Sequence, residues 1–366
     1  MEKVFDVHTH TTIFERPIYE TADIYRKEME ITGTEKIVFA GLPHHADDGV
    51  HLTYDYMQNL RCLTCKHLFG ENGYAFAGLV HPLVETDLRI RSKSYLEQIK
   101  EYEAAGFDGI KMLEGNPSMR KAMKLPLSHW VYDQFYAYAE AHNIPILMHL
   151  AHPAYFWDMS KLSEYARSRG WGCDESFPKK EEFHREANEI MQKFPKLKLV
   201  LAHMGFLSED IKEAERWLSY PNTMFDLTPG GEQILTMGEH WDIWHEFFVK
   251  YQDRIMYGSD LRAFPCEPEE KWIEDVQRRP ALLRQFFETD TKHIYGGNAF
   301  KGIKIEKEIR EKLYYKNAER FLGVRKEIDY EYMKVQAQRL LQEPKKGDAY
   351  ADSDLEYIIR DFVVIK

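Results

Sequence analysis

Cysteine is scarce in this chain of 366 residues, which contains four. They stand at Cys62, Cys65, Cys173 and Cys266, too few to crosslink a chain of this length with disulfides. Cys62 and Cys65 have the spacing of half a zinc knuckle or of a redox pair, but the sequence has no second close pair and the segment around them has helical spacing. We expect reduced thiols with packing roles, because a structural zinc site needs about four ligands.

The chain also lacks an excess of basic residues and a long hydrophobic run. Lysine and arginine number 49 against 60 aspartates and glutamates, which gives a net charge of −11 at pH 7. Nucleic acids and anionic membranes attract concentrated positive charge, so neither is an expected partner. No apolar run approaches the roughly 20 residues that span a bilayer, and no charged and apolar leader follows Met1. We expect a cytoplasmic protein that acts on a small molecule.

Short apolar runs rich in β-forming residues recur along the chain, with helical spacing between them. Several are apolar at successive positions, such as residues 146–148 and 199–201, which is typical of strands buried on both faces of a parallel sheet. Eight such runs predict an α/β fold, a distorted (β/α)8 TIM barrel with its active site at the C-terminal strand ends. The expected strands are 3–7, 35–40, 75–81, 108–113, 144–149, 197–203, 223–227 and 253–258.

The barrel is expected to occupy residues 1–323, with insertions in its rim loops. Beyond it, residues 326–341 have the spacing of one more amphipathic helix and residues 355–365 form a short apolar end. This helical C-terminal extension, 324–366, is predicted to pack on the barrel or on a second subunit, because so apolar a terminus is costly to expose. A homodimer is therefore one expected assembly.

Metal-binding side chains stand at the C-terminal ends of several expected strands. His8 and His10 end the first strand two residues apart, so the strand period of two puts both on one face. His149 ends the fifth strand, His203 ends the sixth, and Asp260 follows the eighth. Neutral imidazole suits Zn²⁺, Mn²⁺ or Fe²⁺, and a third nitrogen with a carboxylate would leave one coordination position open for water. The pattern predicts a site for one divalent transition metal, with Zn²⁺ as the first choice.

Six motifs around these residues resemble the amidohydrolase superfamily. Within it they are similar to the amidohydrolase-related branch that includes aminocarboxymuconate semialdehyde decarboxylase and related lactonases and hydratases. The resemblance implies metal ligation by His8, His10, His149 and Asp260, with His203 beside the metal-bound water. The motifs, which follow one another in the expected order, are Phe5 to His10, Gly106 to Lys111, Ile144 to His149, Leu199 to Gly205, Arg254 to Asp260 and Asn317 to Gly323.

The chemistry of the residues supports the same division. A bound metal lowers the pKa of water toward about 7 in the best-studied zinc case, and an imidazole such as His203 takes or returns a proton in that range. Asp260 can coordinate the metal or steer the water, and the sequence leaves both catalytic roles open. The expected reaction is hydrolysis of an ester, lactone or amide, with non-oxidative decarboxylation of an unsaturated or aromatic acid as the alternative. A metal-binding barrel without turnover is a third reading, and it would not need His203 and Asp260 together.

Two places could add a second metal. In binuclear members of the superfamily, a carbamylated lysine from the fourth strand bridges two ions, and Lys111 stands at about that place. The branch resembled here usually works with one metal, so we expect Lys111 to bind a substrate carboxylate or to have a structural role. The loop His44-His45-Ala46-Asp47-Asp48 could also hold an ion, but a solvated loop is the expected reading.

Rim loops supply the other candidate substrate contacts. Arg120 and Arg262 follow the fourth and eighth strands, where a guanidinium fork would match a substrate carboxylate, with a surface ion pair as the competing reading for each. The longest insertion, residues 151–178, carries His152 and Trp157 among several aromatic residues. An aromatic loop over the metal is expected to act as a lid or as a wall of the substrate site.

Overall fold

The structure is a computed structural model, and it describes most of the chain. The loop 44–48, Cys266 and residues 363–366 of the apolar C-terminal end lie outside the described residues, so the predictions made for them stay untested. No helix in the described part of the chain combines the length and the apolar character needed to cross a bilayer. The described residues are 2–11, 16–42, 52–81, 93–162, 164–168, 170–228, 231–262, 269–343 and 348–362.

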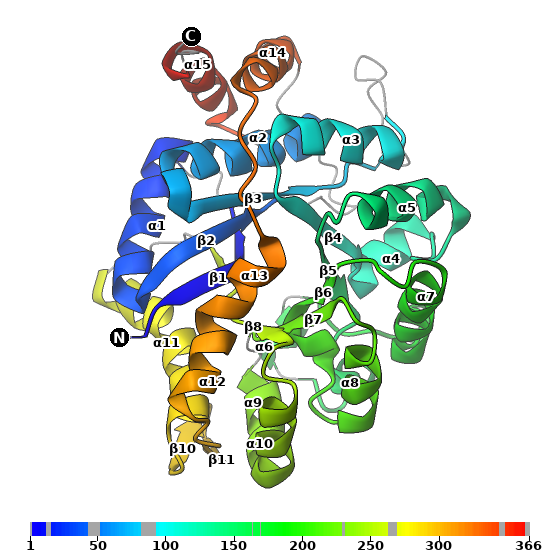
Figure 1. Ribbon diagram of the computed structural model, residues 1–366, viewed down its shortest axis with the longest axis vertical. Coiled ribbons are helices and arrows are strands. Elements are labelled where there is room, and N and C mark those ends of the chain that lie inside the picture. The colour runs from blue at the N-terminus through cyan, green and yellow to red at the C-terminus, as the bar shows by residue number, and fades with distance from the viewer. Residues whose placement is uncertain are drawn as a thin grey trace.

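All eight predicted strands are present, and they lie side by side in chain order in one parallel sheet (Figure 1). A further short strand, β9 (Leu261–Arg262), pairs with β1. The ends of the sheet meet, because the Val7 N–H donates to the Tyr257 carbonyl (3.1 Å) and the Asp260 N–H donates to the His8 carbonyl (2.7 Å). The sheet therefore curls into the predicted barrel. Its strands are β1 (Val4–His10), β2 (Thr34–Ala40), β3 (Gly73–Gly78), β4 (Gly109–Gly115), β5 (Ile146–Leu150), β6 (Leu199–Leu201), β7 (Thr223–Asp226) and β8 (Ile255–Met256).

Helices connect the strands and cover the outside of the barrel (Figure 1). Local sequence explains their ends: α3 begins after Ser94, which forms a capping box with Glu97, and stops at Gly106 in the left-handed conformation (φ 95°). The helices of the barrel are α1 (Ile18–Thr32), α2 (Leu52–Leu68), α3 (Tyr95–Ala105), α4 (Pro117–Met123), α5 (Asp133–Ala141), α6 (Glu164–Ser168), α7 (Lys180–Lys193), α8 (Ile211–Leu218), α9 (Gly231–Glu239), α10 (Trp241–Lys250), α11 (Glu269–Glu288), α12 (Lys307–Glu311) and α13 (Asn317–Leu322). A hairpin of β10 (Lys292–Tyr295) and β11 (Asn298–Lys301) lies between α11 and α12 in the chain.

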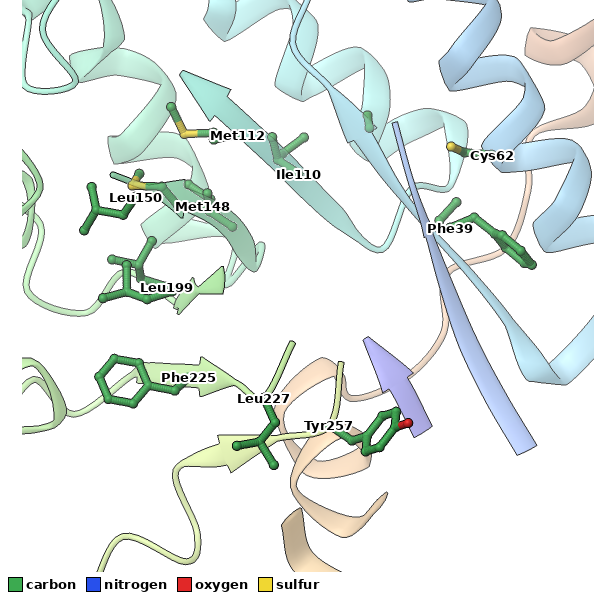
Figure 2. Packing of buried hydrophobic residues seen from close by; sticks show 14 of the residues in the cluster. Phe39, Cys62, Ile110, Met112, Met148, Leu150, Leu199, Phe225, Leu227 and Tyr257 are labelled. Atoms are coloured by element: carbon green, nitrogen blue, oxygen red, sulfur yellow. The ribbon is translucent and has the colours of Figure 1, made fainter. Parts of the chain in front are cut away.

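The strands bury apolar side chains on both faces, as the continuous apolar runs predicted. The larger cluster lies between strands and helices, and Figure 2 shows part of it, with Phe39 of β2, Met112 of β4 and Phe225 of β7. The smaller cluster fills the barrel interior. Its strand residues, such as Leu147 and Val200, occupy the positions that alternate with those of the larger cluster. It also includes Ala318 and Phe321 of α13. The barrel interior is therefore a packed core beneath the polar site and not an open pore.

A bulge in β1 decides what the first strand presents to the interior. Phe5 and Val7 belong to the interior apolar cluster, and the pairing of β1 with β2 slips between Asp6 and Thr9. This slip allows His8 and His10 to face the interior as well, although they have the opposite parity. Oδ1 of Asp6 accepts from the N–H groups of His8 and Ser259 (3.1 Å each), which fixes the bulge against the loop after β8.

The C-terminal extension packs on the barrel through α14 (Tyr330–Leu341) and α15 (Ala351–Asp361), which contact each other and α2. A buried ion cluster fastens it. Arg61 of α2 donates from Nη1 to Asp348 Oδ2 and from Nε to Asp354 Oδ2, both at 2.8 Å, and Asp354 Oδ1 accepts from the Ile18 N–H. All three charged side chains are buried. The extension is therefore tied to the middle of α2 and to the start of α1 by buried groups.

Replacing Arg61 by methionine is expected to lower the free energy of unfolding by about 3–5 kcal/mol, because it leaves two buried carboxylates without their cation. Urea unfolding of the two proteins would measure the difference. Arg185→Met is the matched control, since Arg185 forms an exposed pair with Glu189 within α7 and such pairs contribute about 0.3–0.5 kcal/mol. Equal losses in the two variants would contradict this account of the extension.

Candidate metal centre

Two histidines of β1 form the centre of the cluster. Nδ1 of His8 donates to Asp226 Oδ2 (2.8 Å), and Nδ1 of His10 donates to the Ala40 carbonyl (2.9 Å). A carboxylate and a carbonyl only accept, so both rings carry their proton on Nδ1 and present the lone pair of Nε2. The two Nε2 atoms lie 3.0 Å apart. Two lone pairs at this distance repel unless a cation binds them, and two nitrogens on one tetrahedral zinc ion lie about 3.3 Å apart for bonds of about 2.0–2.1 Å, close to the separation seen here.

Asp260 brings a carboxylate to the same place. Its Oδ1 lies 3.2 Å from Nε2 of His10, and the ligand atoms of His8, His10 and Asp260 all lie within 4.8 Å of one another, a group that could hold a metal ion. The backbone of Asp260 is left-handed (φ 54°), and the Arg279 guanidinium of α11 donates to its carbonyl (2.8 Å). Burial raises the pKa of Asp260, but the nearness of His10 and the positive charges of Arg279 and Arg262 outweigh it and keep this pKa well below its usual range.

His149 and His203 lie beside this group. The His203 ring centroid is 5.3 Å from that of His8 and 5.0 Å from that of His149. His149 does not belong to the group within 4.8 Å. Its Nε2 is buried, however, and has no hydrogen-bond partner within the described residues. A buried nitrogen without a partner is costly, so a metal ligand role for His149 fits this geometry.

All four imidazoles are kept neutral. Burial lowers the pKa of His8, His10 and His203 to about 4 each, and it lowers the pKa of His149 well below the usual range. Neutral imidazole is the form that binds a transition metal. Three neutral nitrogens and one ionised carboxylate are a donor set that suits Zn²⁺, Mn²⁺ or Fe²⁺, so the residues present fit such a metal.

Asp226 is a central residue of the site that the sequence reading missed. Its Oδ2 accepts from Nδ1 of His8, and its Oδ1 accepts from the backbone N–H groups of His203 (2.8 Å) and Thr228 (3.0 Å). One carboxylate at the end of β7 therefore fixes the tautomer of His8 and the position of His203. A charged residue within the apolar run 223–227 was the available signal, since a buried carboxylate needs partners.

Asp226→Asn is expected to weaken metal binding by about 10- to 100-fold, the usual cost of losing the group that orients a ligating histidine. The amide presents only one accepting atom, so it cannot accept from both His8 and the His203 backbone as the carboxylate does. A competition titration against a chelating dye would measure the affinity. Asp210→Asn, at the exposed N-cap of α8, is the control and should leave the affinity unchanged. Equal affinities in all three proteins would contradict the role of Asp226.

Lys111, which the sequence placed on the fourth strand, lies inside the barrel against the metal group. Its side chain is buried, and its Nζ is 2.8 Å from Nε2 of His8. Burial lowers the pKa of Lys111 to about 8, although Asp226 and Asp260 act in the opposite direction. Neither the carbamate nor the substrate reading of Lys111 is tested by this geometry.

The other candidate substrate residues divide into two groups. Arg262 of β9 pairs with His10 in the sheet register and is exposed, and the His152 ring lies 5.3 Å from that of His149. By contrast, the Arg120 guanidinium is taken up by Glu186 of α7 (3.0 Å), and Trp157 Nε1 donates to the Pro178 carbonyl (3.0 Å). The structure therefore brings Arg262 and His152 to the cluster, and it uses Arg120 and Trp157 to join segments of the rim.

Phe156, next to Trp157, is the aromatic residue of the insertion that approaches the histidines. Its ring lies 5.2 Å from that of His152. Phe206 continues the same wall, with its ring stacked on that of His203 (4.9 Å between centroids, 20° between planes) and 5.6 Å from that of His149. An aromatic wall thus borders the polar cluster on the side of β5 and β6.

A protein-family model described as amidohydrolase matches residues 71–324 of this chain. A search of curated protein sequences gives no match. Solved structures give many. A 4-oxalomesaconate hydratase from Rhodopseudomonas palustris is 15% identical with a TM-score of 0.51, covering 93% of this chain and 100% of its own.

Two further solved structures have the same level of similarity. A dihydroxybenzoic acid decarboxylase from Polaromonas sp. JS666, with bound manganese and the inhibitor 2-nitroresorcinol, is 14% identical with a TM-score of 0.51 and covers 88% of this chain and 97% of its own. The IDCase of Metarhizium anisopliae in its apo form is 15% identical with a TM-score of 0.51 and covers 87% of this chain and 97% of its own. At these identities the likeness shows a shared fold.

Proposed function

Since the chain belongs to the amidohydrolase family, a metal-dependent family of enzymes, we propose that His8, His10, His149 and Asp260 bind one divalent transition metal. Zn²⁺ is the first choice, with Mn²⁺ or Fe²⁺ as alternatives. The proposed reaction is hydrolysis of an ester, lactone or amide bond in a small carboxylated substrate. The observation that carries the proposal is the pair of Nε2 lone pairs facing each other at 3.0 Å with the Asp260 carboxylate beside them.

The metal, when bound, would polarise the substrate carbonyl and lower the pKa of water. The residues of the chain supply the rest. His203 is neutral and lies beside the ligand group, so its imidazole can accept a proton from water and return it to the leaving group. The ionised Asp260 carboxylate can accept a hydrogen bond from the same water and orient it. Asp226 holds the His203 backbone, which fixes the direction of approach of the base.

Arg262 is the proposed contact for a substrate carboxylate. It extends from β9 at the open end of the barrel, and the structure shows no ion pair or hydrogen bond of its side chain with other described residues. It is nevertheless close enough to lower the pKa of Asp260 through its charge. An exposed guanidinium next to an otherwise buried site suits bidentate binding of a carboxylate.

Arg262→Met is expected to raise KM for a carboxylate substrate by about 10-fold or more while kcat changes little, because the contact is made equally in the ground state and the transition state. Steady-state kinetics would measure both constants. Arg278→Met removes an exposed arginine from α11 and is the control for the change in charge. An unchanged KM for Arg262→Met would remove Arg262 from the substrate site.

Decarboxylation is the second candidate, and a specific observation favours it. One solved structure with this fold is a dihydroxybenzoic acid decarboxylase with bound manganese, and the aromatic wall of Phe156 and Phe206 would suit a flat unsaturated acid. In that reaction the bond to the carboxylate breaks, its electron pair stays on the substrate carbon, and that carbon takes a proton. The neutral His203 imidazole lies outside the proposed ligand set, with its ring centroid 5.3 Å from that of His8, and it would relay that proton from water to the carbon, leaving hydroxide.

A product screen decides between the two reactions. Metal-loaded protein would be incubated with a panel of lactones, esters and unsaturated carboxylic acids, and the products would be identified by mass spectrometry together with released CO₂. We expect a hydrolysed acid and no CO₂. Release of CO₂ would replace hydrolysis by decarboxylation as the function. No product from any class with a fully loaded site would contradict both.

A further inference from the structure

The turn that carries His203 has a backbone that L-residues rarely adopt. His203, Met204, Gly205 and Phe206 have φ angles of 55°, 51°, 60° and 53°, so four successive residues are left-handed. Each of the three residues with a side chain is strained in this conformation. Strained backbone of this kind persists only where surrounding groups hold it, and it is concentrated at functional sites. The groups that hold this turn therefore bear on the position of the His203 imidazole.

Contacts hold the turn at both of its ends. At the start, the His203 N–H donates to Asp226 Oδ1 (2.8 Å). At the end, the Lys180 ammonium of α7 donates to the Phe206 carbonyl (2.7 Å). The Phe206 ring in turn stacks on the His203 ring. The position of the Phe206 carbonyl is thus linked to the imidazole both through three peptide units and through the stacked rings.

Lys180 stands where a lysine is locally unfavourable. It is the first residue of α7, and the positive end of a helix dipole disfavours a cation in the first turn. Burial lowers the pKa of Lys180, with the carboxylates of Glu209, Glu181 and Asp210 acting in the opposite direction. A cation that is unfavourable at a helix start and loses part of its hydration needs a compensating contact. Among the described residues, the hydrogen bond to the Phe206 carbonyl is the one that the Lys180 side chain makes.

The same helix start is also tied to the rim insertion. Trp157 donates from Nε1 to the carbonyl of Pro178, two residues before Lys180. The insertion, the start of α7 and the left-handed turn therefore form one connected series. Lys180 links the rim to the end of the turn, and His184 of the same helix lies against its middle at Gly205.

We propose that Lys180 is a positioning residue, whose ammonium group holds the left-handed turn 203–206 and through it the His203 imidazole. The proposal rests on the proposed proton transfer by His203 for its catalytic consequence. The structural claim, that Lys180 holds the turn, is independent of that proton transfer, because it can be measured without a substrate. Lys180 itself touches neither the proposed metal ligands nor Arg262 in the described contacts.

Hydrogen exchange measured by mass spectrometry on the metal-loaded protein tests the structural claim. In Lys180→Met, the amides of residues 204–207 are expected to exchange about tenfold faster or more than in the wild type, because the turn opens more often. Lys180→Arg can still donate to the carbonyl and should restore most of the protection. Lys212→Met is the matched control, an exposed lysine of α8 with the same change in charge. Unchanged exchange in Lys180→Met would overturn the proposal.

Kinetics test the consequence for His203. With a substrate from the product screen, Lys180→Met should lower kcat about tenfold, leave KM within about twofold and keep the metal content, since the ligands lie elsewhere. In the His203→Asn background the same substitution should have no further effect on kcat. Equal losses of kcat in both backgrounds, or faster exchange without any loss of kcat, would overturn the positioning role. If the wild type turns over no substrate, the proposed function fails, and the exchange experiment alone decides whether Lys180 holds the turn.

Discussion

His8→Ala combined with His10→Ala is expected to reduce the metal content of the purified protein from about one equivalent per chain to none. The two substitutions remove both of the Nε2 atoms that face each other at 3.0 Å. Of the proposed ligand set they leave one imidazole, His149, and one carboxylate, Asp260. Two remaining ligands cannot compete with buffer and water for a transition metal. Elemental analysis by mass spectrometry, with the protein concentration determined independently, would measure the content.

The matched control replaces two histidines away from the site, His142 at the end of α5 and His240 before α10. That variant should retain the full metal content, which separates loss of ligands from loss of histidine in general. Full metal content in the His8 and His10 double variant would contradict the assignment of the site. A folded double variant is verified by its circular dichroism spectrum before the metal is measured.

His203→Asn is expected to retain the metal while turnover falls by about 10² or more, the range typical of a lost general acid or base. Asparagine can keep a polar contact but cannot exchange a proton near neutral pH. The backbone N–H of residue 203 remains available to Asp226, so the turn keeps its anchor at that end. Metal analysis and kcat would be measured on the same preparation. A loss of metal parallel to that of His149→Ala would make His203 a ligand instead of a base.

The barrel was predictable because the signals that define it are local. Apolar runs on successive positions identify strands buried on both faces, and the polar residues at the ends of those runs identify the rim. The expected run 197–203 nevertheless ends as a strand at Leu201, because the backbone turns left-handed at His203. No residue preference signals that turn, since of its four members only Gly205 favours positive φ.

The parts of the site that sequence reasoning missed depend on contacts between distant segments. Asp226 was included in an expected strand but not recognised as a partner of His8, 218 residues away. Arg279 and Lys180 lie on helices, where their spacing is that of ordinary surface residues. Their roles become visible only when α11 is seen to approach Asp260 and α7 to approach Phe206.

The interior position of Lys111 depends on the shape of the barrel. The end of the fourth strand was predicted, but the depth of the side chain relative to the rim depends on the stagger between neighbouring strands, which a single sequence does not reveal. The bulge in β1 is similar. The spacing of His8 and His10 puts both on one face, while the slip in pairing after Asp6 decides that this face is the interior.

Anomalous diffraction from a crystal of the wild-type protein, recorded on both sides of the absorption edge of the bound metal, would locate the metal and its ligands. We expect one anomalous peak per chain, within bonding distance of Nε2 of His8 and His10 and bonded also to His149 and Asp260. Two peaks bridged by a modified Lys111 would contradict the single-metal site. A peak elsewhere, with His8 and His10 unligated, would contradict the site itself.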